Sequence, residues 1–400
     1  MSESSIEQQL NELLAESPED AARRAASRFS LREGDRLALY GAGTLGLAVL
    51  EKLRRAGVES AAFADDTPEK QGQVIGGLPV MTPQEFHARY GERALFVVTI
   101  LNPMLRFLEA KRRLETLVGA RVISFLDLAW KYPREFLPYY QFVLPQQVLS
   151  ERREILRAFQ LFEDEESRRQ FVDHLRFRLY LDYEALPENS WANYFPADLD
   201  LGLPPGTTFV DCGAYDGDTV RFFLDHQRGR FREIFAFEPD EANCRRLSEY
   251  VRGLGDEAAR RIHIYRAGVG ASRAKMSFHP TGNMSASFSR EGETEVEVLP
   301  VQEIVEDQSG PIYVKYDVEG AEWEALEGTK ELIERAEPVL AVSIYHRPDD
   351  LWRLPLYLKS LNPGYRLFLR TQGEDGMDVI CYAVPGRQDA PAASTGTDLR

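Results

Sequence analysis

Short apolar runs alternate with amphipathic stretches in two separate parts of the chain. In the first part, the pattern predicts a strand that turns into a helix within 36–57, further strands at 60–66, 94–101 and 121–125, and a helix at 103–118. Strands that alternate with helices favour parallel pairing through right-handed crossovers. Residues 34–126 are therefore predicted to form one α/β domain with a Rossmann-like sheet.

The second part, residues 201–387, shows the same alternation over a longer stretch. Its predicted strands are 207–213, 233–239, 262–270, 275–279, 312–320, 338–346, 365–371 and 378–385. The fold class predicted for the whole chain is α/β, with two Rossmann-like doubly wound sheets, of which the C-terminal one carries the candidate chemistry.

Three further segments complete the predicted organisation. Residues 1–33 have a helical pattern with Leu10, Leu13 and Leu14 on one face. In residues 127–200 strand signals fade and apolar side chains recur at helical spacing, which predicts a helical connector. The polar, small-residue segment 388–400 predicts a disordered tail.

Composition narrows the classes of partner. The formal net charge of −16 argues against a nucleic acid, because binding to a phosphate backbone depends on clustered Lys and Arg. No apolar run approaches the length of a membrane span and the N-terminal pattern is polar, so we expect no membrane insertion and a cytoplasmic protein. The cysteines Cys212, Cys244 and Cys381 are too scattered for a disulfide framework or a zinc cluster. A homo-oligomer stays open.

The stretch VDCGAYDGDT at 210–219 places glycines and acids between a strand and a helix. Gly213 and Gly217 permit a tight turn and close approach of a ligand to the backbone. Asp211, Asp216 and Asp218 would repel phosphates, so a cationic ligand fits this loop better.

Glu238 stands after the next strand, about 20 residues further on, where an acid can bind both hydroxyls of an unphosphorylated ribose. A nucleoside with a positive tail that lacks phosphate satisfies both requirements. The sequence therefore predicts S-adenosylmethionine as the cofactor.

Three motifs, FVDCGAYDGDT, FAFEPD and IYVKYDVEGAEWEAL, resemble those of the FkbM family of class I methyltransferases over about 206–385. The resemblance implies a seven-stranded sheet with an antiparallel final strand, and O-methylation of sugar or polyketide hydroxyls in many members. It also implies where the cofactor lies. The positions carried over are Asp211, Gly213, Tyr215 and Gly217 for the methionine portion, Asp218 and Thr219 at the helix start, Glu238 for ribose, and Ala267 and Gly268 near the adenine. Residues 1 to about 200 lie outside this core and are candidates for setting the substrate.

Methyl transfer requires an aligned acceptor oxygen and a group that removes its proton. His346 is our first choice for the base, since histidine has an unperturbed pKa of about 6.5. Asp317 and Glu319 would orient the hydroxyl. A second mechanism stays open, in which Asp317, Glu319 or Glu322 bind a divalent metal with His346. The structural alternatives are that Glu322 begins a helix and that His346 is an ordinary strand-end residue.

The first domain contains a separate glycine pattern. Gly41, Gly43 and Gly46 follow a strand and open a helix, and Asp65 stands at the distance of a ribose-binding acid. The motif is typical of domains that bind NAD or a nucleotide-linked sugar. A scaffold or a partner-binding surface is the alternative, and no catalytic Lys, Tyr or Cys group accompanies the loop.

The leading hypothesis is therefore an S-adenosylmethionine-dependent O-methyltransferase acting on a small-molecule or saccharide acceptor. The runner-up is a non-catalytic nucleotide-binding, nucleotide-sugar-binding or assembly protein that retains a methyltransferase fold. A third hypothesis is an NAD-dependent oxidoreductase in which the second domain is accessory.

Overall fold

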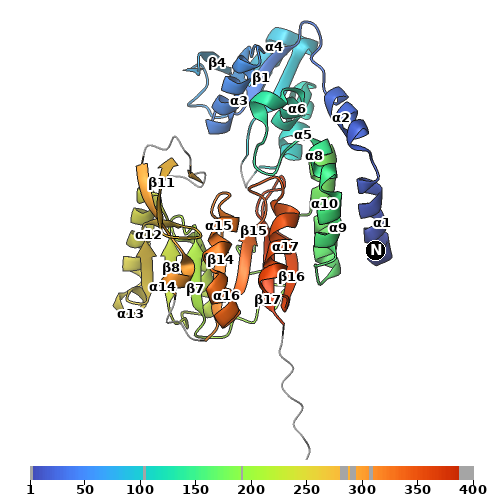
Figure 1. Ribbon diagram of the computed structural model, residues 1–400. Coiled ribbons are helices and arrows are strands. Elements are labelled where there is room, and N and C mark those ends of the chain that lie inside the picture. Colours follow the sequence, from blue (N-terminus) through green and yellow to red (C-terminus); the bar gives the residue numbers. More distant parts are fainter. Residues whose placement is uncertain are drawn as a thin grey trace, which may run out of the picture. The chain divides into compact units, whose positions relative to one another are not determined.

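The chain folds into two compact units in a computed structural model that describes residues 3–101, 105–190, 192–279, 287–288, 294–305 and 310–386 (Figure 1). The first unit comprises 1–196, 343–354 and 369–380, and the second comprises 197–342, 355–368 and 381–400. The predicted tail 388–400 lies outside the described residues, and the predicted domain boundaries stay predictions. The predicted α/β class is confirmed by parallel-dominated sheets in both units.

The first unit contains a six-stranded sheet in the order β3-β4-β2-β1-β5-β6. Its strands are β1 (Arg36–Tyr40), β2 (Ala62–Ala64), β3 (Val74–Ile75), β4 (Leu78–Met81), β5 (Ala94–Val98) and β6 (Arg121–Ser124). All pairs except the β3–β4 hairpin are parallel. The five parallel strands follow the order of a doubly wound nucleotide-binding sheet. Sequence analysis missed β3 and β4, which are too short to show a pattern.

Helices surround this sheet and extend the first unit. They are α1 (Glu3–Leu14), α2 (Pro18–Ser27), α3 (Thr44–Arg55), α4 (Pro83–Tyr90), α5 (Phe107–Val118), α6 (Phe125–Lys131), α7 (Pro133–Phe136), α8 (Pro145–Ser150), α9 (Arg152–Phe159) and α10 (Glu165–Tyr180). Leu10, Leu13 and Leu14 of α1 are buried. Pro18 begins α2, because proline fits the first helical position and Ser17 caps the helix.

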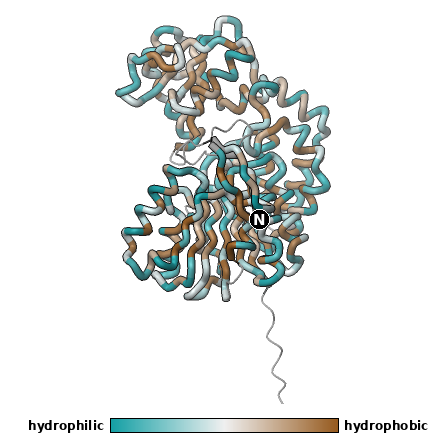
Figure 2. Tube along the Cα trace, turned by 60° about the vertical axis from the view of Figure 1, so that its left-hand side comes forward, coloured by the Kyte–Doolittle hydropathy of each residue, from teal (hydrophilic) through white to brown (hydrophobic). Residues whose placement is uncertain are grey.

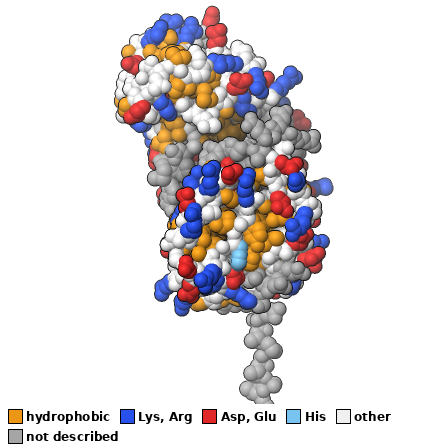
Figure 3. Space-filling model, turned by 90° about the vertical axis from the view of Figure 1, so that its left-hand side faces the viewer, with side chains coloured by type: hydrophobic (Ala, Val, Ile, Leu, Met, Phe, Trp, Pro, Cys, Tyr) orange, Lys and Arg blue, Asp and Glu red, His pale blue; other side chains and the backbone are white. Residues whose placement is uncertain are grey.

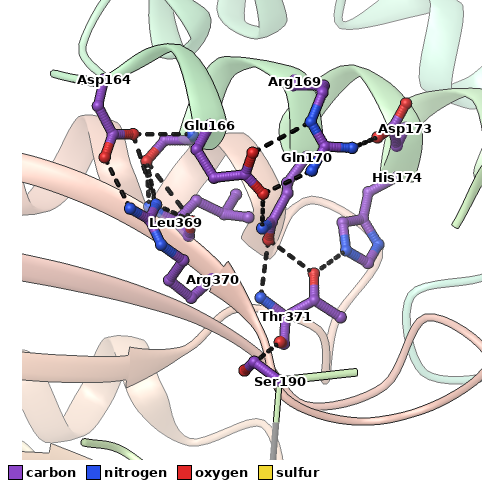
Figure 4. A network of polar contacts seen from close by, with 11 residues as sticks. Asp164, Glu166, Arg169, Gln170, Asp173, His174, Ser190, Leu369, Arg370 and Thr371 are labelled. Carbon is purple, nitrogen blue, oxygen red and sulfur yellow. Dashed lines mark hydrogen bonds and ion pairs between the residues drawn. The ribbon is translucent and has the colours of Figure 1, made fainter. Parts of the chain in front are cut away.

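Buried polar groups bind α10 to the end of β16 (Tyr365–Thr371) within the first unit (Figure 4). Asp164 caps α10 and forms a 2.7 Å ion pair with Arg370. Gln170 Oε1 accepts a 2.8 Å hydrogen bond from the backbone N–H of Thr371, whose hydroxyl lies 2.7 Å from Nε2 of His174. Complete burial lowers the pKa of His174 to about 3. His174 is therefore a neutral structural histidine at physiological pH.

The second unit contains a seven-stranded sheet in the order β16-β17-β15-β14-β7-β8-β9. The remaining strands are β7 (Thr208–Cys212), β8 (Ile234–Phe237), β9 (Ile262–Tyr265), β14 (Ile312–Tyr316), β15 (Val339–Ser343) and β17 (Val379–Pro385). Strands β7, β14 and β15 are buried throughout, and Figure 2 shows hydrophobic residues concentrated along strands of this sheet. This is the seven-stranded sheet that the family resemblance implied.

The direction of the final strand follows from one hydrogen bond. The backbone N–H of Ile344, directly after β15, donates to Val379 O at 2.8 Å, so β17 begins where β15 ends. The final strand therefore runs antiparallel to β15, as expected. The helices associated with the sheet are α11 (Asp218–Gln227), α12 (Glu241–Gly253), α13 (Asp256–Ala259), α14 (Val301–Ile304), α15 (Glu322–Glu327), α16 (Lys330–Ala336) and α17 (Asp350–Leu361).

A smaller four-stranded sheet corrects one strand prediction and confirms another. Its strands are β10 (Ala267–Val269), β11 (Ala274–His279), β12 (Ser287–Phe288) and β13 (Thr294–Leu299). The single strand predicted at 262–270 is wrong, because it divides into β9 and β10, which belong to different sheets. The strand predicted at 275–279 pairs with β13, which sequence analysis missed.

Charges of both signs are interspersed on the face that carries β11 and α12 (Figure 3). Lys275 pairs with Glu295 at 2.8 Å, and Arg273 pairs with Glu303 at 2.6 Å. Within each pair the opposite charges offset each other, and exposed ion pairs contribute little to stability.

Candidate functional site

The loop between β7 and α11 requires its two predicted glycines. Gly213 has φ +87°, and a Cβ there would lie 1.9 Å from the carbonyl oxygen of Asp317. Gly217 has φ +89°, and its Cβ would lie 2.7 Å from Leu247. The first contact places the loop after β7 directly against the loop after β14 (Asp317 onward). Any side chain at 213 would separate them.

Two non-glycine residues of the predicted site also have left-handed backbone conformations. Tyr215 has φ 47° in the loop after β7, and Glu319 has φ 54° in the loop after β14. Such conformations cost about 1–3 kcal/mol and concentrate at ligand-binding and catalytic loops. Both loops are therefore held in shapes that their residue types do not favour.

Glu238 joins the end of β8 to the loop after β7. Its Oε2 accepts a 2.9 Å hydrogen bond from the backbone N–H of Tyr215. Its Oε1 accepts from the backbone N–H of Asp240 at 2.8 Å and from Asn243 Nδ2 at 3.2 Å. Burial raises the pKa of Glu238, although these amides partly oppose the shift. The carboxylate predicted to bind ribose thus lies beside the predicted cofactor loop.

A lysine that sequence analysis missed lies beneath this loop. Lys315 on β14 pairs in register with Asp211 on β7, and its Nζ lies 3.1 Å from Asp211 Oδ1. The same Nζ donates a 2.5 Å hydrogen bond to Gly213 O and lies 4.0 Å from Asp317 Oδ2. A lysine inside the apolar strand IYVKY was the available signal, because a buried ammonium requires a carboxylate partner.

Burial and the proximity of opposite charges change the pKa values of Asp211 and Lys315. Loss of solvent raises the pKa of Asp211 to about 7, and Lys315 partly opposes that shift. Burial disfavours the charged form of Lys315, but the carboxylates of Asp211, Asp317 and Asp218 outweigh it and raise the lysine pKa. Each partner thus favours the charged form of the other, and the ammonium offsets part of the cost of burying the Asp211 carboxylate.

Two of the three acids in the loop after β7 pair with cationic side chains, which the sequence did not indicate. Asp211 is fully buried with Lys315, and Asp216 forms a 2.9 Å ion pair with Arg221 of α11. Asp218 at the start of α11 accepts a 2.7 Å hydrogen bond from the backbone N–H of Thr219. The predicted acidic pocket thus contains two paired carboxylates.

The residues predicted near adenine lie on a different element from the one expected. Ala267 and Gly268 are buried in β10, which pairs in parallel with β13 of the small sheet. They follow β9 after one intervening residue. Their role in adenine binding stays a prediction.

Glu322 stabilises its own loop. It is buried, and its Oε1 accepts hydrogen bonds from the backbone N–H groups of Val318 at 3.0 Å and Gly320 at 3.4 Å. This arrangement favours the structural interpretation, in which Glu322 begins α15.

His346 follows β15 and belongs by its contacts to the first unit. It is buried, with its ring centroid 4.1 Å from that of Tyr345 and 6.1 Å from that of Tyr140. Its role as a base, and those of Asp317 and Glu319 as orienting groups, stay predictions. Across the described ranges, no three His, Cys, Asp or Glu side chains are grouped so as to hold a metal ion.

In the first unit, the acid that was predicted to bind ribose, Asp65, is bonded to the glycine loop itself. Asp65 Oδ2 accepts a 2.8 Å hydrogen bond from the backbone N–H of Ala42 and lies 3.0 Å from Lys70 Nζ. Burial opposes the charge of Asp65, but hydrogen bonds from Thr67, Ala42 and Lys70 lower its pKa to about 2.

The three glycines of this loop differ in what requires them. Gly41 has φ +115°, and a Cβ at Gly46 would lie 2.0 Å from Gly41 O. A Cβ at Gly43 would meet no atom within 4 Å. Packing therefore explains Gly41 and Gly46 but not Gly43.

The space beyond β5 and β6 is filled by residues 374–377. Asp375 accepts a 2.8 Å hydrogen bond from the backbone N–H of Phe107 at the start of α5, and Glu374 pairs with Arg106 at 2.8 Å. The remaining cavity there, lined also by Met377, measures about 20 Å³. A dinucleotide extends across the carboxyl ends of such strands, and here the chain itself occupies that space.

Comparison with known families supports the motif resemblance. Residues 211–374 match the family described as the Methyltransferase FkbM domain. The chain therefore contains a methyltransferase-type domain. More specifically, residues 211–374 match an FkbM methyltransferase domain, which confirms the resemblance predicted from its motifs.

A solved structure shows a similar fold over nearly the whole chain. Methyltransferase FkbM from Methylobacillus flagellatus KT matches with a TM-score of 0.73 and 22% identity, over 95% of this chain and 98% of that chain. An rRNA methylase from Streptococcus thermophilus matches with a TM-score of 0.30 and 13% identity, over 46% and 91% of the two chains. Fibrillarin from Aeropyrum pernix with bound S-adenosyl-L-methionine matches with a TM-score of 0.31 and 14% identity, over 48% and 76%.

No curated protein sequence matches the chain. Within the described residues, no helix combines the length and the apolar character needed to cross a membrane.

Proposed function

We propose that this protein transfers the methyl group of S-adenosylmethionine to a hydroxyl oxygen of a saccharide or related metabolite. The observation that carries the cofactor assignment is the hydrogen bond between Tyr215 N–H and Glu238, which places a carboxylate beside a glycine loop at the ends of adjacent parallel strands. A ribose bound there can present its hydroxyls to Glu238. The FkbM domain match supports methyl transfer as the reaction.

The proposed mechanism assigns proton removal to His346 and orientation of the acceptor hydroxyl to Asp317 and Glu319. The cofactor supplies an electrophilic methyl group with a good leaving group, so alignment and proton removal are the tasks of the protein. A saccharide or related metabolite is proposed as the acceptor because the FkbM resemblance implies O-methylation of sugar or polyketide hydroxyls in many members.

An NAD-dependent oxidoreductase is less well supported. Asp65 is already bonded to Ala42 and Lys70, and residues 374–377 occupy the space that the second half of a dinucleotide would need. A nucleotide or nucleotide-linked sugar at the first glycine loop is supported by the strand order of the sheet and the open position of Gly43, but Asp65 is already paired with Lys70. We therefore favour a scaffold role for the first unit.

Isothermal titration with S-adenosylmethionine tests the cofactor assignment. Glu238→Ala should weaken binding by about tenfold or more, because it removes charge-assisted hydrogen bonds to ribose. Glu241→Gln is the matched control, since Glu241 is three residues away on α12 and its side chain is 58% exposed. Equal affinities for both variants would contradict the assignment, and NAD binding without S-adenosylmethionine binding would favour the oxidoreductase.

Turnover distinguishes an enzyme from a non-catalytic assembly protein. Candidate glycans and other hydroxyl compounds would be incubated with the protein and the cofactor, and methyl uptake would be detected by mass spectrometry. The expected result is a mass increase that corresponds to one added methyl group and that Glu238→Ala reduces at limiting cofactor concentration. Tight cofactor binding without methyl uptake by any acceptor would favour the assembly protein.

A further inference from the structure

Lys315 is a buried cation in a place where the fold alone does not require one. Its side chain is 2% exposed and that of its partner Asp211 is 0% exposed. Removing two charges from water is expensive, and a buried ion pair often stabilises a protein no better than two apolar residues of similar volume. The pair therefore calls for an explanation beyond stability.

The ammonium connects the two loops of the candidate site. Its hydrogen bond to Gly213 O holds the loop after β7, and its other carboxylate neighbour, Asp317, begins the loop after β14. The backbone N–H of Asp317 also donates to Cys212 O at 3.0 Å. Lys315 thus lies at the point where the two loops touch.

The pair also sets the charge beneath the cofactor loop. With Asp211 ionised, the two charges cancel, and Asp317 and Asp218 remain as carboxylates whose charge acts on Lys315. S-Adenosylmethionine carries a positive sulfonium, whereas its product S-adenosylhomocysteine carries a neutral thioether. An unbalanced positive charge under the loop would disfavour the first ligand relative to the second.

We propose that Lys315 is a positioning residue that anchors Gly213 and, balanced by Asp211, sets the preference of the site for the sulfonium cofactor over its demethylated product. This inference rests on the proposed function. It concerns charge balance, so its readout is the ratio of two affinities rather than activity.

The test measures dissociation constants for S-adenosylmethionine and S-adenosylhomocysteine by isothermal titration. Asp211→Asn leaves the ammonium unbalanced and should lower the preference for the sulfonium ligand by about tenfold. The double variant Asp211→Asn with Lys315→Met removes both charges and should return the preference to within about twofold of wild type. Lys315→Met alone should weaken both ligands, because Gly213 O loses its donor.

A second variant guards against misfolding. The side chain of Asp317 is 29% exposed, so Asp317→Asn changes the charge facing Lys315 without altering the fully buried pair. It should shift the preference in the same direction by a smaller amount, about threefold. An unchanged ratio in both single Asp variants, or no recovery in the double variant, would overturn the inference while the proposed function stands. Failure of the wild-type protein to bind either ligand would overturn both.

Discussion

The two glycine loops of this protein share one hydrogen-bonding arrangement but differ in the other partners of its carboxylate. In each, a carboxylate at the end of the neighbouring strand accepts a hydrogen bond from a loop N–H, Asp65 from Ala42 at 2.8 Å and Glu238 from Tyr215 at 2.9 Å. In the first unit Lys70 also pairs with the acid, whose pKa falls to about 2. In the second unit the carboxylate is held by amides and its pKa is raised by burial.

This difference shows that the spacing of the motif does not reveal whether its acid is paired with a cation or held only by neutral donors. An acid paired with a cation has little to gain from ribose hydroxyls, whereas an acid held only by neutral donors can exchange them for others. The decisive partner, Lys70, is five residues from Asp65 and forms no part of the glycine fingerprint.

The largest expected effect tests whether the second loop depends on its contact with the loop after β14. Gly213→Ala should cost more than about 3 kcal/mol, because the new methyl group would meet Asp317 O and the backbone has a positive φ. Urea unfolding measures the loss. Gly253→Ala, where a Cβ meets no atom within 4 Å, is the control. Wild-type stability in Gly213→Ala would contradict the close approach of the two loops.

The second effect concerns chemistry. His346→Ala should preserve cofactor affinity and lower turnover by roughly 10²-fold, the usual scale for loss of a general base. The measurement compares titration of the cofactor with methyl uptake by an identified acceptor. An unchanged rate would remove His346 from the mechanism and leave it as a packing residue beside Tyr140 and Tyr345.

The third effect compares the two acids by their pH dependence. The folded pKa of Asp65, about 2, lies below the ordinary aspartate value of 3.8, so its ionised form should stabilise the protein above pH 4 by about 2 kcal/mol and lose that contribution as the pH falls toward 2. Asp65→Asn should remove this dependence.

The shift of Glu238 has the opposite sign. Its raised pKa means that wild type loses stability as the pH rises through and above 4.5, and Glu238→Gln should remove that loss. Unfolding free energies of both variants and of wild type between pH 2 and pH 7 provide the measurement. Parallel pH profiles for the two variants would show that the two loops do not differ as described.

The smallest effect concerns the one glycine in the first loop that packing does not explain. Gly43 is the N-cap of α3, has φ −104° and has open space around its Cβ position, so Gly43→Ala should change the unfolding free energy by less than about 1 kcal/mol. Gly46→Ala, which would clash with Gly41 O, is the contrasting variant. A large loss in Gly43→Ala would indicate a contact outside those described.

Local patterns were sufficient for most of the architecture. The buried runs of β7, β14 and β15 and the three motifs around Asp211, Glu238 and Asp317 identified the sheet and the family. The sequence did not indicate that β10 would leave the main sheet, since β9 and β10 are separated by a single residue. It also concealed the pairing of Lys315 with Asp211, because partners 104 positions apart meet only when their strands align.

The attachment of α10 to the end of β16 has a consequence for how this chain is made. Residues 343–354 and 369–380 complete the first unit, yet they leave the ribosome after nearly all of the second. Until then, Asp164, Gln170 and His174 cannot form their contacts with Arg370 and Thr371. A truncated polypeptide ending near residue 200 would therefore expose this surface, and the N-terminal half should be expressed only together with the rest.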